Sequence, residues 1–188
     1  MNPDKIDYDI KTERLFLRPL QNEDVPKMFA ILQKYPDITK FMSFEPPKKV
    51  EETRGFFYES QKSFPEKSIR WGIFLEGKFV GIIALEGIER KMRAWITETA
   101  EIGYWLSPEF HNQGIMTEAG KAVLGFGFER LKLHKITINH ISENIASQKV
   151  IEKMGFRYVG EMKDHFFRSK KWMSDKLYEM NVDEFNAQ

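Results

Sequence analysis

The sequence predicts a single α/β domain built on a mixed β-sheet. Residues 99–106 alternate in polarity as a strand does, an amphipathic helix pattern begins at Ile115, and residues 135–141 are strongly β-forming. This strand–helix–strand order predicts two parallel strands joined by a right-handed crossover. Two further apolar stretches, 69–75 and 79–85, are joined by a short glycine-containing turn and predict an antiparallel hairpin. The sequence shows no repeat, low-complexity segment or linker, so we expect one domain over residues 1–188 with its core at about 12–182.

Composition limits the classes of function. The chain has 188 residues, a formal net charge of +1 and 41% hydrophobic residues, which is ordinary for a soluble globular protein. Its basic residues are interspersed with acidic ones, which disfavours nucleic acid as a partner. The absence of cysteine excludes disulfides, thiolate nucleophiles and Cys-ligated zinc, and it permits a reducing cytoplasm. We find no apolar signal region and no apolar run of membrane-spanning length, so we expect a cytoplasmic protein with no membrane partner.

The first half of the chain is predicted from alternation and capping signals. Leu15 and Leu17 alternate with Arg14, Phe16 and Arg18, and an Asn or Asp side chain suits the start of the helix that follows. The predicted elements are a strand at 12–19, a helix from Asn22 or Asp24 to about Lys34, a loop at 41–47, a helix at 50–64, and a charged connection at 89–98.

The last part of the chain has a second capped helix followed by a hairpin. Asn144 can cap the helix, and Gly155 is typical of a helix C-terminus. Residues 157–162 and 176–182 are predicted as closing strands around a polar turn at 169–171.

The joint between the central strand and its helix, around Gly114, predicts an anion-binding loop. The first turn of a helix projects free N–H groups, and the helix dipole favours negative charge there. The same pattern is also that of an ordinary tight turn. The motif is neither a Walker A loop, since no Gly-Lys-Ser/Thr is present, nor a dinucleotide fingerprint, since G-x-G-x-x-G is absent.

The full run EIGYWLSPEFHNQGIMTEA resembles the acyl-CoA pyrophosphate loop of the GNAT acyltransferase superfamily, usually written Gln/Arg-x-x-Gly-x-Gly/Ala. His111 stands at the Gln/Arg position, Gly114 at the central glycine and Met116 at the last position. His111 and Met116 depart from the consensus, which is tolerable if backbone N–H groups bind the diphosphate. The run is most similar to the RimJ/RimL-type branch, the N-terminal acetyltransferases of ribosomal proteins.

The resemblance implies a GNAT-like domain whose mixed sheet splays at the middle, with helices on both faces. Acetyl-CoA would be the co-substrate and would enter the splay, its pantetheine amides bonding the strand edge near Trp105 and Leu106. The cofactor-binding residues implied in this way are Trp105, Leu106, His111, Asn112, Gln113, Gly114, Ile115, Met116, Thr117 and Asn144.

SENIASQKVIEKMGF (142–156) resembles the family's second motif, which implies catalytic roles for two of its residues. Asn144 would hydrogen-bond pantetheine, and Ser147 would donate a proton or a hydrogen bond to the departing thiolate. Without the resemblance, both are ordinary helix-start residues. Many family members carry a tyrosine acid seven residues after this asparagine, where this chain has Ile151. The family's strand glutamate would fall on Asn139, which leaves Glu101 as the candidate base, acting directly or through water.

The acceptor is predicted from acid–base arithmetic. An α-amine with a pKa of about 7.7–8.0 is partly neutral at pH 7, whereas a lysine amine at about 10.4 is almost fully protonated. A site without a dedicated base therefore favours the N-terminal α-amine of a protein or peptide. A small amine such as a polyamine, amino acid or antibiotic, and a non-catalytic CoA-binding module, remain alternatives. The four histidines lack metal-ligand spacing, so no metal is expected. A homodimer is left open.

Overall fold

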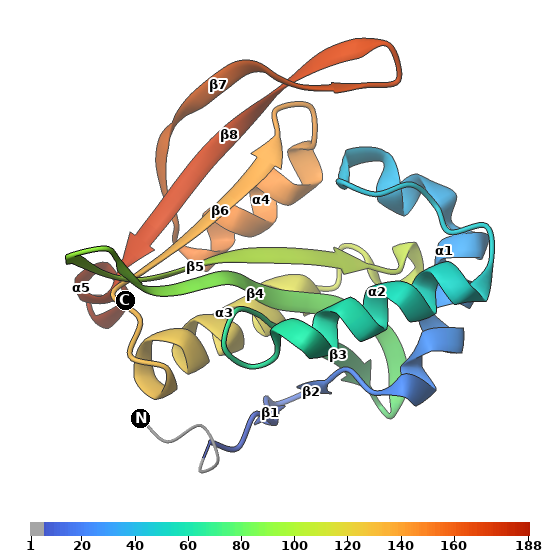
Figure 1. Cartoon of the computed structure of the whole chain (residues 1–188), viewed down its shortest axis with the longest axis horizontal. Coiled ribbons are helices and arrows are strands. Elements are labelled where there is room, and N and C mark those ends of the chain that lie inside the picture. The colour runs from blue at the N-terminus through green and yellow to red at the C-terminus, as the bar shows by residue number, and fades with distance from the viewer. Residues whose placement is uncertain (1–5) are drawn as a thin grey trace.

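One mixed sheet organises the chain. The structure is a computed structural model and describes residues 6–188 (Figure 1). Eight strands follow the order β1-β2-β3-β4-β5-β6-β8-β7, and only β5 and β6 are parallel neighbours. This confirms the predicted mixed sheet with a parallel central pair. The strands are β1 (Ile10–Lys11), β2 (Leu15–Pro19), β3 (Ile69–Leu75), β4 (Lys78–Met92), β5 (Trp95–Leu106), β6 (Lys135–Ile141), β7 (Arg157–Arg168) and β8 (Lys171–Asn181).

Helices cover both faces of this sheet, as the resemblance implied. Two separate clusters of buried side chains lie on its two sides, one packed under α3 and α4 and the other under α1 and α2. Residues of β5 alternate between them, because successive strand side chains point to opposite faces. Ile102 and Leu106 join the first cluster and Trp105 joins the second. The helices are α1 (Val25–Lys34), α2 (Val50–Ser63), α3 (Ile115–Gly125, continued by a π-helical turn, Phe126–Arg130), α4 (Ile145–Met154) and α5 (Val182–Asn186).

The parallel pair separates halfway along its length. The pairing of β5 with β6 runs from Thr99 opposite Lys135 to Ile102 opposite Ile138 and then ends. Beyond that point β5 pairs only with β4, and β6 pairs only with β8. The splay predicted at the middle of the sheet is therefore present, and it lies between residues 103–106 and 139–141.

The charged connection predicted at 89–98 is wrong. β4 continues to Met92 and β5 begins at Trp95, so this stretch is a hairpin extension of the two strands. Trp95 and Ile96 are 70% and 77% exposed, so the extension has no buried face at its tip. The alternation that identifies a half-buried strand therefore does not appear in the sequence.

The other predicted boundaries differ more mildly. The strand predicted at 12–19 begins later, as β2 at Leu15, and a separate two-residue strand, β1, lies before it. The closing strands extend beyond their predicted ends and form a long hairpin. Asn144 caps α4, and Gly155 ends it with φ of 91°, as predicted.

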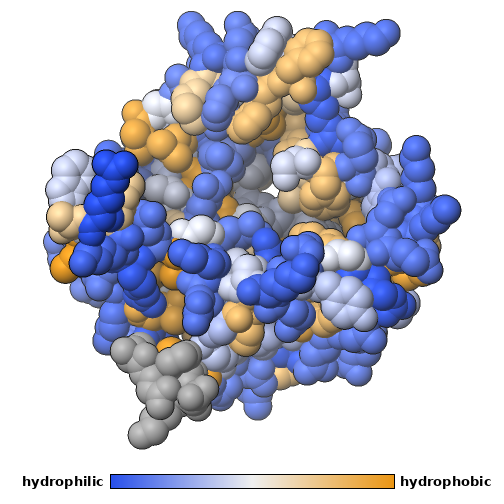
Figure 2. All heavy atoms as spheres, viewed as in Figure 1, coloured by the Kyte–Doolittle hydropathy of each residue, from blue (hydrophilic) through white to orange (hydrophobic). Residues whose placement is uncertain are grey.

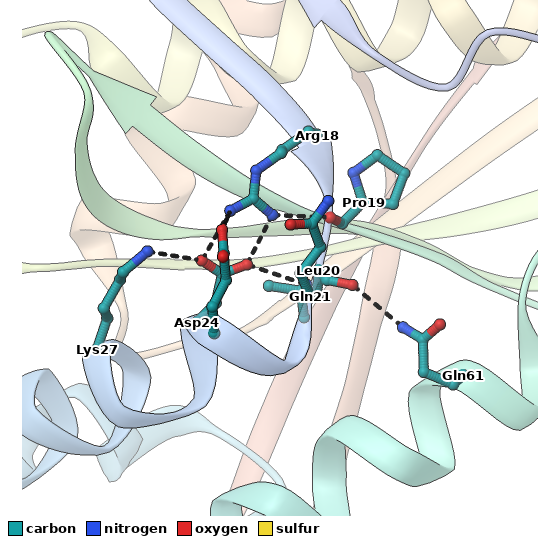
Figure 3. A network of polar contacts seen from close by, with 8 residues as sticks. Arg18, Pro19, Leu20, Gln21, Asp24, Lys27 and Gln61 are labelled. Carbon is teal, nitrogen blue, oxygen red and sulfur yellow. Dashed lines mark hydrogen bonds and ion pairs between the residues drawn. The ribbon is translucent and has the colours of Figure 1, made fainter.

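The start of α1 is held by a buried ion pair rather than by the predicted side-chain cap. Asp24 occupies the N-cap position without a capping bond to the helix, and it is fully buried. Its two carboxylate oxygens accept hydrogen bonds from Arg18, at 2.8 and 3.0 Å, and from Lys27 at 3.1 Å (Figure 3). The Gln61 amide on α2 donates to the Leu20 carbonyl at 3.2 Å in the same network. This network attaches both α1 and α2 to the end of β2.

Candidate active site

The loop before α3 has the geometry of an anion cradle. Gly114 adopts φ of +77°, a left-handed conformation that favours glycine, and α3 begins at the next residue. Within residues 6–188, no backbone N–H from Asn112 to Thr117 donates a hydrogen bond to the protein, and the first to do so is Glu118, to the Gly114 carbonyl. A run of free N–H groups at a helix N-terminus fits the two phosphates of a diphosphate.

The side chains of this loop hold its backbone in place. The His111 Nε2 group donates to the Leu106 carbonyl at 3.0 Å, and the Gln113 amide donates to the Glu109 carbonyl at 3.0 Å. Ile115 and Met116 are buried in the core under the sheet. These predicted residues are therefore arranged to present backbone N–H groups, while their side chains fasten the loop to the end of β5.

Arg14 is a cation that sequence reasoning missed in this region. Its guanidinium pairs with Glu118 at 2.6 Å and donates to the Gln113 carbonyl at 3.1 Å. It also lies 3.6 Å from the position that a side-chain carbon on Gly114 would take. Arg14 lies just before β2, 100 residues before Gly114 in the chain, so only the tertiary structure reveals the contact. Its charge offsets that of Glu118 beside the cradle.

A cavity of about 660 Å³ opens where β5 and β6 separate. Figure 2 shows a hollow in this face, between the closing hairpin at the top and the body below. The wall comes from the ends of β5 and β6, the start of α4, the loop before α2, and the β7–β8 hairpin. It comprises Lys40, Phe41, Met42, Ser43, Glu45, Glu101, Ile102, Gly103, Tyr104, Ile138, Asn139, His140, Ile141, Asn144, Ser147, Phe166, Phe167, Arg168, Met173 and Asp175.

All three predicted catalytic residues line this cavity. Asn144, Ser147 and Glu101 all line it. The Asn144 Oδ1 atom accepts from the Ser147 N–H at 3.2 Å, which is the ordinary helix cap. Its amide NH₂ donates no hydrogen bond within the described chain and can serve a ligand. Trp105 and Leu106 are buried on opposite sides of the sheet, so only their backbone can face the splay.

Tyr104 is the residue that the sequence reasoning overlooked. Its hydroxyl lies 2.8 Å from the Ser147 Oγ atom, and the pair joins β5 to α4 across the splay. Burial raises the pKa of Tyr104 to about 12, although the Ser147 hydrogen bond opposes the shift, so its hydroxyl keeps its proton. The alternation of β5 was the available signal, because Tyr104 must share a face with Ile102. Ile151, at the family's usual tyrosine position, is fully buried in the core.

Glu101 lines the cavity near two other carboxylates and is partly exposed to solvent. Burial raises its pKa, and the nearby charges of Glu86 and Asp175 raise it further. Glu86 is opposite Glu101 on β4 and is paired with Arg70 at 3.0 Å. Within residues 6–188, Glu101 itself has no cationic partner. A carboxylate with a raised pKa is a better proton acceptor than an ordinary one.

The other two carboxylates of the cavity each have one partner, and the Asp175 Oδ2 atom is buried without a partner within residues 6–188. Glu45 accepts from Arg168 at 3.1 Å, and Asp175 accepts from the His165 Nδ1 group at 2.7 Å. Arg168 also donates to the carbonyls of Met42 and Phe44, which attaches the closing hairpin to the loop before α2. The hairpin and this loop therefore form a joined roof over the cavity.

His140 lines the cavity and is held by a hydrogen bond to the backbone. Its Nδ1 group donates to the Ile141 carbonyl at 2.8 Å, and burial lowers its pKa. Among the described residues, no group of three or more His, Cys, Asp or Glu side chains is placed to hold a metal ion. Within residues 6–188, none of the helices combines the length and the hydropathy needed to cross a bilayer.

Comparison with known proteins agrees with this geometry. The family model described as "Acetyltransferase (GNAT) domain" matches residues 14–157. The uncharacterized N-acetyltransferase YoaA of Bacillus subtilis (strain 168) is 28% identical over 163 residues, which cover 85% of this chain and 89% of the relative. Spermidine N(1)-acetyltransferase of Escherichia coli (strain K12) is 26% identical over 151 residues, or 80% of this chain and 77% of the relative.

A solved structure of RimL, a ribosomal L7/L12 alpha-N-protein acetyltransferase in complex with coenzyme A, has the same fold. It superposes with a TM-score of 0.86 at 23% sequence identity and covers 94% of this chain and 99% of that chain.

Proposed function

Since the chain belongs to the GNAT acetyltransferase family and is an N-acetyltransferase, we propose that its acceptor is the N-terminal α-amine of a protein or peptide. The observation that carries this proposal is the charge of the cavity. Three carboxylates line it: Glu45 pairs with Arg168, one oxygen of Asp175 accepts from His165, and only Glu101 has no hydrogen-bond or ion-pair partner within residues 6–188. One unpaired carboxylate suits an acceptor with one ammonium group.

Acetyl-CoA is the proposed donor, and it supplies the acetyl group as a thioester. The free N–H groups of 112–117 would hold its diphosphate, and the Asn144 amide with the free edge of β5 would bind pantetheine. This assignment is supported by the left-handed Gly114 and by the splay, which together lead from the loop to the cavity. The solved RimL complex contains coenzyme A, as its description states.

The proposed chemistry uses two groups on opposite sides of the reacting carbonyl. Glu101 accepts the proton that the ammonium loses, directly or through water, so that the amine nitrogen can attack the thioester carbon. Ser147 then protonates the sulfur as the C–S bond breaks. Serine alone is a weak acid, so the Tyr104 hydroxyl at 2.8 Å passes its proton to Ser147 as Ser147 protonates the sulfur, and Tyr104 regains a proton from water when the products leave. Orientation of both reactants in the cavity lowers the barrier further.

A small amine remains the second candidate. The E. coli relative named as a spermidine N(1)-acetyltransferase favours it, as does the acidic character of Glu45, Glu101 and Asp175. A polyamine would bind its further ammonium groups to Asp175 or Glu45, and Glu45 would first have to be released from Arg168. Because only Glu101 is without any partner within residues 6–188, the single-ammonium acceptor is the better fit.

Thiol release from acetyl-CoA across a panel of acceptors tests the proposal. The panel contains peptides with free Ser or Ala N-termini, the same peptides N-blocked but bearing lysine, and spermidine. We expect release only with free N-termini. Release with spermidine or lysine alone would overturn the α-amine assignment.

The Glu101→Gln variant tests the proton acceptor on the same panel. It should lower turnover of an α-amine at pH 7 by less than the 10²–10⁴-fold typical of a lost general base, because part of that amine is already neutral. The deficit should shrink as the pH rises toward 8 and more amine loses its proton in solution. A deficit independent of pH would contradict the role of Glu101 as base.

A further inference from the structure

Arg14 lies in a short turn that joins β1 to β2. The turn is closed by two hydrogen bonds between its ends. The Thr12 N–H donates to the Leu15 carbonyl at 3.0 Å, and the Leu15 N–H donates to the Thr12 Oγ1 atom at 2.9 Å. Arg14 therefore extends from a restrained backbone to the first turn of α3, where its guanidinium pairs with Glu118.

The Glu118 carboxylate is occupied entirely by donors from this turn. Its Oε1 atom accepts from the Thr12 hydroxyl at 2.5 Å and from the Arg14 backbone N–H at 3.2 Å. Its Oε2 atom accepts from the Arg14 Nε group at 2.7 Å. Burial would raise the pKa of Glu118, but these hydrogen bonds outweigh burial and lower it, so the carboxylate is charged at neutral pH. Glu118 therefore fixes the plane of the Arg14 guanidinium.

Arg14 uses another nitrogen to reach the loop before α3. Its Nη1 group donates to the Gln113 carbonyl at 3.1 Å. The peptide bond between Gln113 and Gly114 is trans, so this carbonyl and the Gly114 N–H point in opposite directions. The Gly114 N–H is thus directed away from Arg14, and it donates to no acceptor within residues 6–188.

The direction of this peptide group depends on Arg14. Asn112 and Gly114, on either side of Gln113, have left-handed φ values of 60° and 77°, and neither belongs to a helix or strand. In the described part of the chain, no group other than Arg14 donates to the Gln113 carbonyl. A reversed peptide would present the partial negative charge of the carbonyl, instead of the N–H, to an anion bound in the loop.

Stability and simple charge attraction account for this arrangement less well. The Arg14 and Glu118 side chains are 44% and 21% exposed, and ion pairs near the surface contribute little to folding stability. The charge of Glu118 also offsets the attraction of Arg14 for an anion. The bond from Arg14 to the loop backbone remains as the contact that bears on ligand binding.

We propose that Arg14, oriented by Glu118, is a positioning residue of the donor site. By holding the Gln113 carbonyl, Arg14 keeps the Gly114 N–H directed at the diphosphate of acetyl-CoA. This inference rests on the proposed function for acetyl-CoA as the donor, and it is independent of the acceptor.

Calorimetric titration with CoA, without any acceptor, tests the role of Arg14. Arg14→Met keeps the length of the side chain and removes its donors. We expect it to weaken CoA binding by about tenfold or more, the effect of one lost hydrogen bond to a charged group. Pantetheine, which lacks the diphosphate, should bind this variant as it binds wild type. An equal loss for both ligands would show a general distortion and overturn the positioning role.

Arg157→Met is the matched control for loss of an exposed arginine. Arg157 pairs with Glu179 and Glu184 and has no contact with the loop before α3 in the described structure. This variant should bind CoA and pantetheine as wild type does. A loss of CoA affinity as large as that of Arg14→Met would overturn the assignment to Arg14.

Glu118→Gln separates positioning from charge attraction. The substitution removes a negative charge beside a diphosphate, so attraction alone predicts tighter CoA binding. If Glu118 is needed to orient Arg14, the variant should instead bind CoA several-fold more weakly. Unchanged or tighter binding would overturn the proposal.

The amide NMR signal of Gly114 reports the orientation of the peptide. In wild type, CoA should shift this signal strongly, as expected when the N–H donates to a phosphate, and the shift should be smaller in Arg14→Met. Arg14→Lys keeps the charge, but one ammonium group lacks the planar fork that binds Glu118 and Gln113 together, so its CoA affinity should stay several-fold below wild type. Wild-type affinity in Arg14→Lys, or no CoA-induced shift of Gly114 in wild type, would overturn the proposal.

The titrations separate this inference from the proposed donor. If wild type binds CoA no more tightly than pantetheine, the loop is not a diphosphate site and the donor assignment fails with it. If wild type prefers CoA and Arg14→Met keeps the same preference, the donor assignment stands and the positioning role of Arg14 is wrong.

Discussion

At the scale of single residues, the Tyr104–Ser147 contact is the feature with the most direct chemical consequence. A serine hydroxyl is a weak acid on its own. The Tyr104 hydroxyl is protonated at neutral pH and can assist proton donation by Ser147 through the 2.8 Å hydrogen bond. The second motif implied the role of Ser147, but the pairing with Tyr104 cannot be read from sequence spacing, because 43 positions separate the two residues. The splay of β5 from β6 and the placement of α4 bring them together.

Replacement of either residue tests the pair. Ser147→Ala and Tyr104→Phe should each lower kcat, by about 10²-fold if the pair acts as a general acid, while acetyl-CoA affinity stays nearly intact. The double variant should lose little more than Ser147→Ala, because groups that act as one unit are not additive. Single-turnover rates and acetyl-CoA titrations measure both quantities. Wild-type turnover in Ser147→Ala would reduce Ser147 to a helix-end residue.

Gly114 carries a second prediction at this scale. Valine at φ of +77° strains the backbone and adds bulk beside Arg14, so Gly114→Val should weaken CoA binding by at least tenfold, as titration calorimetry would show. Gly114→Asn is the matched control, since asparagine tolerates this conformation and should lose less. If CoA binds Gly114→Val as tightly as wild type, the loop is not the diphosphate site.

At the scale of elements, the roof of the cavity depends on one arginine. Arg168 sits near the tip of the β7–β8 hairpin and donates to two carbonyls, those of Met42 and Phe44, in the loop before α2. The turn at 169–171 was predicted from its polar residues, and the structure places Ser169 and Lys170 in left-handed conformations there. Arg168 contacts a loop about 125 residues earlier in the chain, and no local sequence pattern predicts such a contact.

The Arg168→Met variant tests this connection. It keeps the length of the side chain and removes the donors, so the loop at 41–45 should exchange its amide hydrogens faster. The KM for the acceptor should rise several-fold, with the KM for acetyl-CoA unchanged. Lys171→Met, at the same hairpin and paired instead with Glu143, is the control. An equal effect of both variants would indicate a general loosening of the hairpin.

At the scale of the whole molecule, the fold was more predictable than the site. The βαβ order, the capped α4 and the hairpin β3–β4 follow from local patterns, and all are present. The loop around Gly114 was found from its motif, because its proposed function resides in the backbone. Tyr104, Arg14 and Arg168 were missed because their partners are distant in the chain. The hairpin extension at 89–98 was missed because few of its side chains are buried, so its sequence lacks the alternation of apolar and polar residues that identifies a strand.

The buried carboxylate of Asp24 makes a prediction about overall stability. Burial alone would raise its pKa, but hydrogen bonds from Arg18, Gln21 and Lys27 outweigh burial and lower it. Its contribution to folding is therefore present above its unfolded pKa of about 3.9 and is lost as the pH falls further.

Asp24→Asn should lower the free energy of unfolding at pH 7 by about 3 kcal/mol, since it leaves the mostly buried Arg18 without its main partner. Urea unfolding at pH 7 and at pH 3 measures this difference, which should narrow at the lower pH. Glu23→Gln removes an exposed partner of the same arginine and should cost less than about 1 kcal/mol. A constant difference across this range would show that charge is not what stabilises the site.

The separation of β5 from β6 also bears on how long the protein survives in a cell. Where β6 leaves β5, the backbone edge at 103–105 has no neighbouring strand and is open to a ligand that forms hydrogen bonds as a strand does. Whatever pairs there contributes to the folding equilibrium, and a ligand at a hundred times its Kd adds about 2.7 kcal/mol to the stability of the native state. The amount of folded protein would then depend on the concentration of acetyl-CoA. When acetyl-CoA is scarce, more of the protein would be unfolded and degraded by proteases.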